Sequence, residues 1–263
     1  MKKMHVYILI MVLAIPLPVT ALRFLMHTRH AFGTPTDYTA DANCVGAYYM
    51  NGTGGSAETD RSGNGYTLTL GSADVGQSTS KPPGYSGNSR IFNTAETDYM
   101  YNTSLSISGA DQALSIACWI RFISTNITQS FVSQYNTTGS QRAWHLRATS
   151  AGTYNMLISS NGVNNVGTAI THGIAPGEWS HVVATYDDTE ILLYTNGVVA
   201  STNAYTAGIF ASSADFSIGS SSGSSNPADA RIDEVIVFDR ALTPAEIVEI
   251  YTSGIDGTKG GTD

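Results

Sequence analysis

The sequence predicts an all-β protein: an antiparallel two-sheet sandwich with one short C-terminal helix. Three observations lead to this prediction. Short apolar segments rich in β-branched and aromatic residues are separated by turn residues, which is typical of sandwich strands. The chain has 26 glycines, and its charged residues make up 13%, about half of the ~25% found in an average soluble protein. Helical spacing of apolar residues appears near the C-terminus, after the last strand.

The N-terminal residues have the composition of an export signal. Two lysines precede the apolar run Val6–Leu17, and small residues follow where signal peptidase would cleave. We expect residues 1–21 to be a cleaved signal peptide. The alternative is an uncleaved anchor, because the apolar stretch is nearly long enough to span a membrane. Residues 22–42 are expected to form an N-terminal arm or linker.

The segment 230–254 carries the strongest local signals. Ile232–Phe238 is an apolar run without clean alternation, which predicts a strand that is covered on both faces. A capping box follows, with Thr243 as N-cap, proline at the first helical position and Glu246 at the third. Gly254 is placed to end this helix in the left-handed conformation.

The other strands are predicted from apolar segments flanked by turn residues. Leu114–Phe122 alternates in a way that predicts one core face and one partly solvated face. An Asn-Gly pair after Ile191–Thr195 indicates a β-hairpin. The remaining strands are expected at Val45–Met50, Tyr66–Leu70, Ser89–Asn93, Asp98–Tyr101, Ser130–Gln134, Ala143–Ala148, Tyr154–Ser159, Val163–Ile170, Glu178–Asp187 and Asp215–Gly219.

Several of these segments resemble the motifs of the laminin G-like, concanavalin A-like family of jelly-roll domains. The similar segments are IDEVIVF with the following RAL and TPAEI, EWSHVVATYD with the following LYTNG, LSIACWIRF, and DRSGNG. The chain departs from the family after Phe92, where an Asp-Gly pair is missing. The resemblance covers about residues 43–254. It implies a two-sheet antiparallel jelly-roll sandwich over that range, with residues 255–263 left as a flexible tail.

Charge and cysteine content limit the partners and the redox chemistry. The net charge is -8, and lysine and arginine do not cluster beyond the first few residues. A nucleic-acid partner is therefore not expected. The chain has two cysteines, Cys44 and Cys118, too few for a disulfide scaffold. Cys118 lies within an apolar strand, which favours a buried thiol, and a bridge between the two is the alternative if their strands are neighbours.

The carboxylates do not have the spacing that glycoside hydrolysis needs. The same jelly roll carries glucan hydrolases in the family it resembles, and their reaction uses two carboxylates ~5 Å apart. Glu96-Thr97-Asp98 is followed by no second glutamate. Asp233 and Glu234 are adjacent, so that in a regular strand they would point to opposite faces. We therefore predict that the chain is not an enzyme.

Calcium is the ion that the sequence favours. Asp60 precedes a Ser-Gly-Asn-Gly turn, and hard cations prefer carboxylates and the carbonyl oxygens of turns. The resemblance implies that this early loop lies near the aspartate of the IDEV strand. The candidate ligands of a structural Ca²⁺ are therefore Asp60, Asn64 and Asp233. The alternative is that Asp60 only caps its own turn.

Sugar binding calls for exposed aromatic side chains near loops. Four aromatic residues lie in or beside expected loops and are the candidate ligand-binding residues, with core packing as the alternative: Tyr135, Trp144, Tyr154 and Tyr205. Trp119 and Trp179 fall within motifs of the resembled family, which implies that they are buried core residues.

The predicted function is that of an exported, non-catalytic binding or adhesion module that recognises a glycan or protein outside the cell. It would be secreted or displayed at the cell surface. The alternative is a structural surface protein, such as a filament, sheath or virion subunit built on the same jelly roll. In that case the arm 22–42 would mediate self-association by pairing with the sheet edge of a neighbour.

Overall fold

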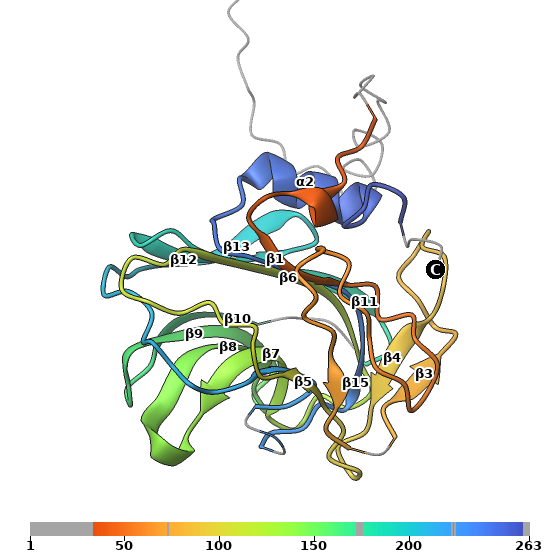
Figure 1. The fold of residues 1–263 in the computed structure, drawn as a ribbon, viewed down its shortest axis with the longest axis horizontal. Coiled ribbons are helices and arrows are strands. Elements are labelled where there is room, and N and C mark those ends of the chain that lie inside the picture. Colours follow the sequence, from red (N-terminus) through yellow and green to blue (C-terminus); the bar gives the residue numbers. More distant parts are fainter. Residues whose placement is uncertain (1–33, 73, 172–175, 222, 224, 260–263) are drawn as a thin grey trace, which may run out of the picture. The chain divides into compact units, whose positions relative to one another are not determined.

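The computed structural model describes residues 34–259, except for residues 73, 172–175, 222 and 224. These residues fold into two antiparallel sheets packed face to face, with one short helix, α2 (Pro244–Ser253). The helix lies on the outer side of the larger sheet, and the smaller sheet lies on the opposite side (Figure 1). This confirms the predicted all-β jelly-roll sandwich with a single short C-terminal helix.

The larger sheet has eight strands in the described part of the chain. Their order is β13-β12-β11-β6-β15-β4-β3, and β1 also pairs with β15. First and last strands are thus neighbours. The strands are β1 (Cys44–Tyr48), β3 (Gly76–Ser78), β4 (Ser89–Phe92), β6 (Leu114–Phe122), β11 (Trp179–Tyr186), β12 (Glu190–Thr195), β13 (Val198–Ala204) and β15 (Ala230–Phe238).

The smaller sheet has seven strands in the same described residues, in the order β10-β9-β8-β7-β14-β5-β2. They are β2 (Thr69–Leu70), β5 (Met100–Asn102), β7 (Gln129–Asn136), β8 (Gln141–Ala148), β9 (Thr153–Gly162), β10 (Val166–Thr171) and β14 (Phe216–Ile218). Most predicted strands are present with ends shifted by a few residues. The short strand β3 was not predicted, because it contains no large apolar side chain. Strand β13 is the second strand of the hairpin that the Asn-Gly pair predicted without bounds.

Strand β6 shows how the layers are built. Its alternate residues Leu114, Ile116 and Cys118 belong to the apolar core between the two sheets. The opposite face was expected to be partly solvated, but Ala117 and Trp119 are buried there as well. That expectation is wrong because α2 and the neighbouring loops cover this face and form a second apolar cluster with it. Strand β15 is likewise buried on both faces, as its irregular apolar run predicted.

The helix begins and ends at the predicted residues. Thr243 Oγ1 accepts a hydrogen bond from the Glu246 amide at 3.3 Å, and Glu246 Oε2 accepts one from the Thr243 amide at 2.6 Å. Leu242 and Ile247 are buried in the same apolar cluster, which fits a hydrophobic staple. Gly254 ends the helix at φ 86° and ψ 171°. This is outside the expected left-handed helical region, but it is also a conformation that favours glycine.

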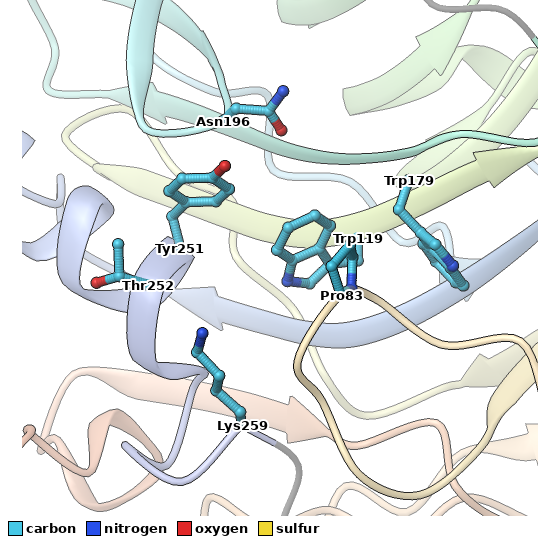
Figure 2. A pocket seen from close by; sticks show the side chains of 7 residues that line it. All are labelled: Pro83, Trp119, Trp179, Asn196, Tyr251, Thr252 and Lys259. Carbon is cyan, nitrogen blue, oxygen red and sulfur yellow. The ribbon is translucent and has the colours of Figure 1, made fainter. Parts of the chain in front are cut away.

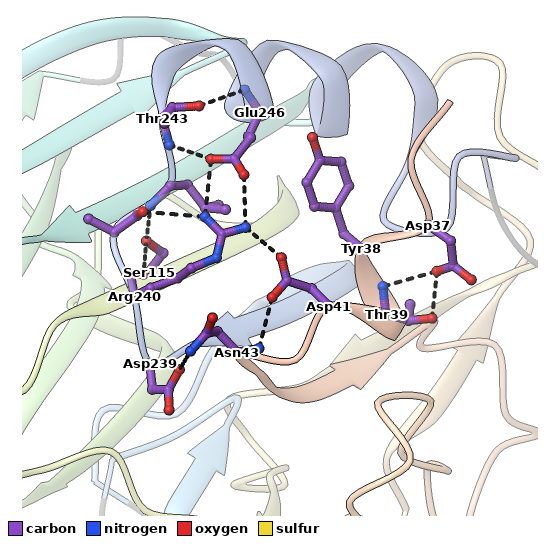
Figure 3. A network of polar contacts seen from close by, with 12 residues as sticks. Asp37, Tyr38, Thr39, Asp41, Asn43, Ser115, Asp239, Arg240, Thr243 and Glu246 are labelled. Carbon is purple, nitrogen blue, oxygen red and sulfur yellow. Dashed lines mark hydrogen bonds and ion pairs between the residues drawn. The ribbon is translucent and has the colours of Figure 1, made fainter. Parts of the chain in front are cut away.

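A polar network joins the helix N-terminus to the beginning of the domain (Figure 3). The guanidinium of Arg240 contacts Glu246 at 2.8 Å and Asp41 at 2.6 Å. These two ion pairs hold the pKa of Asp41 and of Glu246 below the ordinary values. Ser115 Oγ on β6 donates to the carbonyl of Arg240 at 2.7 Å. Segments that are distant in sequence are thereby fixed around one guanidinium.

The compact unit extends beyond the predicted range 43–254 at both ends, beginning at Pro35. Tyr38 Oη donates to Glu249 on α2 at 2.8 Å, so this part of the expected arm lies against the domain. Ile255 is fully buried, and the Lys259 amide donates to the carbonyl of Ser253 at 2.9 Å. The expected boundaries were therefore too narrow, and residues 255–259 are not a flexible tail.

The two cysteines, Cys44 and Cys118, are buried free thiols. Burial raises the pKa of both.

The expected signal peptide, 1–21, lies outside the described residues, as do residues 22–33 of the expected arm. Within the described residues, no helix combines the length and the apolar character needed to cross a membrane.

Candidate functional site: an aromatic pocket beside the C-terminal helix

A pocket of about 260 Å³ opens beside α2, on the outer side of the eight-stranded sheet. Its rings come from separate elements: Trp119 from β6, Trp179 from the start of β11, and Tyr251 from α2 (Figure 2). The other lining residues are Pro83, Asn196, Thr252 and Lys259. Apolar rings with a few polar groups at the margin are the usual make-up of a small-molecule site.

Trp119 forms the most buried part of the pocket and is held rigidly. Its exposed fraction is 5%, and its indole Nε1 donates to Tyr85 Oη at 3.1 Å. The Trp119 and Tyr251 ring centroids lie 5.6 Å apart at an interplanar angle of 31°. The loop that carries Tyr85 and the helix that carries Tyr251 therefore fix the indole from two sides.

The margin of the pocket is formed by a turn and by the half-buried ring of Trp179. The Trp179 indole donates to Ser80 Oγ at 3.3 Å. Asn196 and Gly197 have positive φ of 51° and 80°, as expected for the predicted Asn-Gly hairpin turn. Asn196 Oδ1 accepts the His181 amide at 2.9 Å, which leaves the Asn196 side-chain NH₂ at the pocket as a hydrogen-bond donor.

His181 lies next to the aromatic rings of the pocket and is fully buried. Its ring centroid is 5.2 Å from that of Trp119 and 5.7 Å from that of Tyr251. Neither ring nitrogen has a hydrogen-bond partner among the described residues. Burial lowers the pKa of His181 to about 3, so that the ring is neutral at physiological pH.

The four aromatic residues predicted to bind a ligand are buried, which fits the alternative of core packing. Trp144 and Tyr154 are fully buried in the core between the sheets, and the Trp144 indole donates to the carbonyl of Ile107 at 2.9 Å. Tyr205 is in the same core. Tyr135 is 7% exposed and packs against His145 with 4.7 Å between ring centroids. None of the four offers an open ring face on which a sugar could stack.

Two of the pocket residues, Trp119 and Trp179, fall in motifs of the resembled family, which implied that both are buried core residues. Trp119 is buried, with an exposed fraction of 5%, whereas Trp179 is only half-buried. Alternation along β6 did place Trp119 opposite the core face. This alternation was the signal in the sequence that could have pointed to the pocket. It does not show which segments cover the outer face of the sheet or where that cover ends.

Two of the predicted calcium ligands, Asp60 and Asn64, are engaged in hydrogen bonds to their own loop and to strand β1. Asp60 Oδ1 accepts the amides of Ala47 at 3.1 Å and Ser62 at 2.9 Å. Its Oδ2 accepts the Tyr66 amide at 2.9 Å. The Asn64 side-chain nitrogen donates to the carbonyl of Cys44 at 2.8 Å. This geometry fits the alternative, in which Asp60 organises its turn, and a Ca²⁺ ion at these residues stays a prediction.

Asp233, the third predicted calcium ligand, lies beside a second acidic residue, Glu234. Burial raises the pKa of Asp233, and the charge of Glu234 raises it further. A β-bulge between Asp233 and Ile236 interrupts the pairing of β15 with β6, so the expected strict alternation does not hold. Both carboxyls are 2% exposed. Neither borders the pocket, so neither can act directly on a molecule bound there.

The two-sheet architecture with one C-terminal helix is that of a jelly-roll domain. Residues 94–248 match the family model of the concanavalin A-like lectin/glucanases superfamily. Because this match covers more than half of the chain, the chain belongs to that superfamily. No curated protein matches the chain in sequence.

Solved structures with a similar fold are toxin binding domains. The binding domain of Paraclostridial Mosquitocidal Protein 1 matches with a TM-score of 0.61 at 18% identity, over 80% of this chain and 52% of that one. The receptor-binding domain of botulinum neurotoxin type G gives 0.60 at 16%, over 80% and 51%. The binding domain of botulinum neurotoxin DC, in complex with SialylT, gives 0.59 at 14%, over 81% and 52%. This chain therefore spans about half the length of these domains, and at such identities the likeness shows the fold alone.

Proposed function

We propose that this protein is an exported, non-catalytic binding module that recognises a glycan through the aromatic pocket formed by Trp119, Trp179 and Tyr251. Sugar rings present apolar C–H faces that pack on aromatic rings, and hydroxyls that pair with amide donors such as Asn196. The pocket volume of about 260 Å³ is just below the ~300–1,000 Å³ of drug-sized sites. It suits a single sugar ring at the end of a glycan.

The absence of acidic residues from the pocket supports a binding role. None of its lining residues is an aspartate or glutamate, whereas glycoside hydrolysis uses a carboxylic acid and a carboxylate on the two sides of the bond. The fold neighbours are described as binding domains, one of them in complex with SialylT and another with rat synaptotagmin II. A protein ligand is therefore the second candidate, and we expect no turnover of β-glucans.

A glycan array followed by titration tests this function. Two of the three tryptophans line the pocket, so sugar binding should change the intrinsic fluorescence. Trp179→Leu and Tyr251→Leu should each weaken binding of the array hit by about tenfold or more, the equivalent of ~1.4 kcal/mol.

Tyr101→Leu is the matched control. Tyr101 is a half-buried tyrosine on β5, in the other sheet. This variant should bind like the wild type. The proposal fails if the array and a parallel protein pull-down give no ligand, or if the pocket variants bind as tightly as Tyr101→Leu. Binding of a protein but no glycan would replace the glycan by the second candidate.

A further inference from the structure

The outer face of β7, β8 and β9 carries cationic and polar side chains. Along β8, Trp144 and Leu146 point into the core, so His145 and Arg147 between and after them point outward. The strand pairing places Arg147 between Ser130 of β7 and Asn155 of β9. In Figure 1 this sheet lies on the side of the sandwich away from α2.

Arg142, Tyr135, His145 and Arg147 form a continuous row. The Arg142 guanidinium lies 6.0 Å from the Tyr135 ring centroid, and that ring is 4.7 Å from the His145 ring. Burial is the main cause that lowers the pKa of His145, and the positive charge of Arg147 lowers it further. These contacts leave two guanidinium groups with a neutral imidazole between them.

Three nitrogen atoms in this row have no protein partner. Arg142 Nε, His145 Nδ1 and Arg147 Nε are inaccessible to solvent and form no hydrogen bond within the described residues. His145 is fully buried, and its Nε2 lies 2.8 Å from Ser130 Oγ. These three atoms are themselves covered, but the side chains of Arg142 and Arg147 are half-buried, so that part of each reaches the surface.

The strands that carry this row contain no acidic residue of their own. The chain has a net charge of -8, but its sequence contains no aspartate or glutamate between Asp111 and Glu178. Strands β7, β8 and β9 all fall within this stretch. Accordingly, neither Arg142 nor Arg147 forms an ion pair within the described part of the chain. Guanidinium groups that lack an ion-pair partner suit the carboxylate or sulfate groups of a ligand, to which arginine binds most strongly.

We propose that Arg142 and Arg147 form a second binding site, which takes an acidic oligosaccharide lying along β8. The Cα atoms of the two arginines are separated by up to ~17 Å, from five residues at ~3.4 Å each. A chain with repeated charges can reach both guanidinium groups, whereas a single carboxylate cannot. This site lies on the sheet opposite to the aromatic pocket and does not depend on it.

Calorimetric titration with three hexasaccharides tests the proposal. Hyaluronan hexasaccharide carries carboxylates, chondroitin sulfate hexasaccharide carries carboxylates and sulfates, and cellohexaose is neutral. We expect binding of at least one acidic chain, weaker binding at higher salt because the pairs are partly exposed, and no binding of cellohexaose. The relative affinities of the two acidic chains show which anion the site prefers.

The double variant Arg142→Gln/Arg147→Gln should lose about tenfold or more in affinity. Arg61→Gln/Lys81→Gln removes the same charge from other parts of the molecule and should bind like the wild type. In NMR spectra the Nε–H signals of Arg142 and Arg147 should shift on titration. The proposal is overturned if cellohexaose or a single-stranded DNA dodecamer binds equally well, if both double variants lose the same affinity, or if no acidic chain binds.

The two sites can be tested separately. Trp179→Leu should leave the binding of acidic hexasaccharides unchanged, while the Arg142→Gln/Arg147→Gln variant should leave binding at the aromatic pocket unchanged. If Trp179→Leu abolishes binding of the acidic chain, the chain occupies the pocket, and the second site does not exist.

Discussion

Glu234 should make the protein less stable as the pH rises through neutrality. Its side chain is 2% exposed, and its Oε2 accepts the amide of Ile255 at 3.1 Å. Burial is the main cause that raises its pKa from 4.5 to about 8, and the charge of Asp256 acts in the same direction. Glu234 also has a positive φ of 48°, a backbone conformation that residues other than glycine rarely adopt.

The sign and size of the effect follow from proton binding. The unfolded chain releases this proton near pH 4.5, whereas the folded protein keeps it until about pH 8. The stabilising contribution is therefore complete below pH 4.5 and is lost as the pH rises to about 8. The full difference corresponds to about 5 kcal/mol, at ~1.36 kcal/mol for each pKa unit. About 2 kcal/mol of it should be lost between pH 6.5 and 8. The buried His145 and His181 act in the opposite direction near pH 6.5, because the unfolded chain still binds protons there, but they do so equally in wild type and in a Glu234 variant.

Urea unfolding of wild type and Glu234→Gln at several pH values between 6.5 and 8 measures this loss. Glutamine can still accept the hydrogen bond from Ile255 but does not ionise, so the variant should have a flatter profile. Asp233, whose pKa is also raised, keeps a residual slope of the same sign. Glu178→Gln, at an exposed position, is the control and should follow the wild type. A Glu234→Gln profile as steep as that of the wild type would refute the reasoning.

Three further predictions concern stability. Thr243→Ala removes the acceptor of the capping box and should cost ~1 kcal/mol of unfolding free energy; an unchanged urea midpoint would contradict it. Trp144→Ala leaves a cavity between the sheets and should cost ~3–5 kcal/mol, so a near-neutral result would mean that the indole is not in the core. Asp60→Ala leaves the amides of Ala47 and Tyr66 without an acceptor and should cost ~2–3 kcal/mol. From the turn role we expect the same loss in calcium and in chelator, and a loss confined to calcium would instead place the ion at Asp60.

The sequence determined the features that depend on neighbouring residues. The capping box of α2, the Asn-Gly turn before β13 and the bounds of β6 are each encoded within a few positions, because hydrogen bonds and side-chain alternation there are local. The family resemblance supplied the jelly-roll topology, in which the first strand lies beside the last. These parts of the structure were predicted correctly.

Tertiary structure decided which aromatic rings can meet a ligand. Alternation separates the two faces of a strand, but it does not show which segments cover the outer face. Trp119 is largely buried, but part of its ring lines the pocket because α2 and the loop at Tyr85 approach it without closing over it. Trp144 is inaccessible because the other sheet packs against it. The bulge after Asp233 shifts the register of β15 against β6. The local sequence does not reveal this shift, because it depends on how the two strands pair.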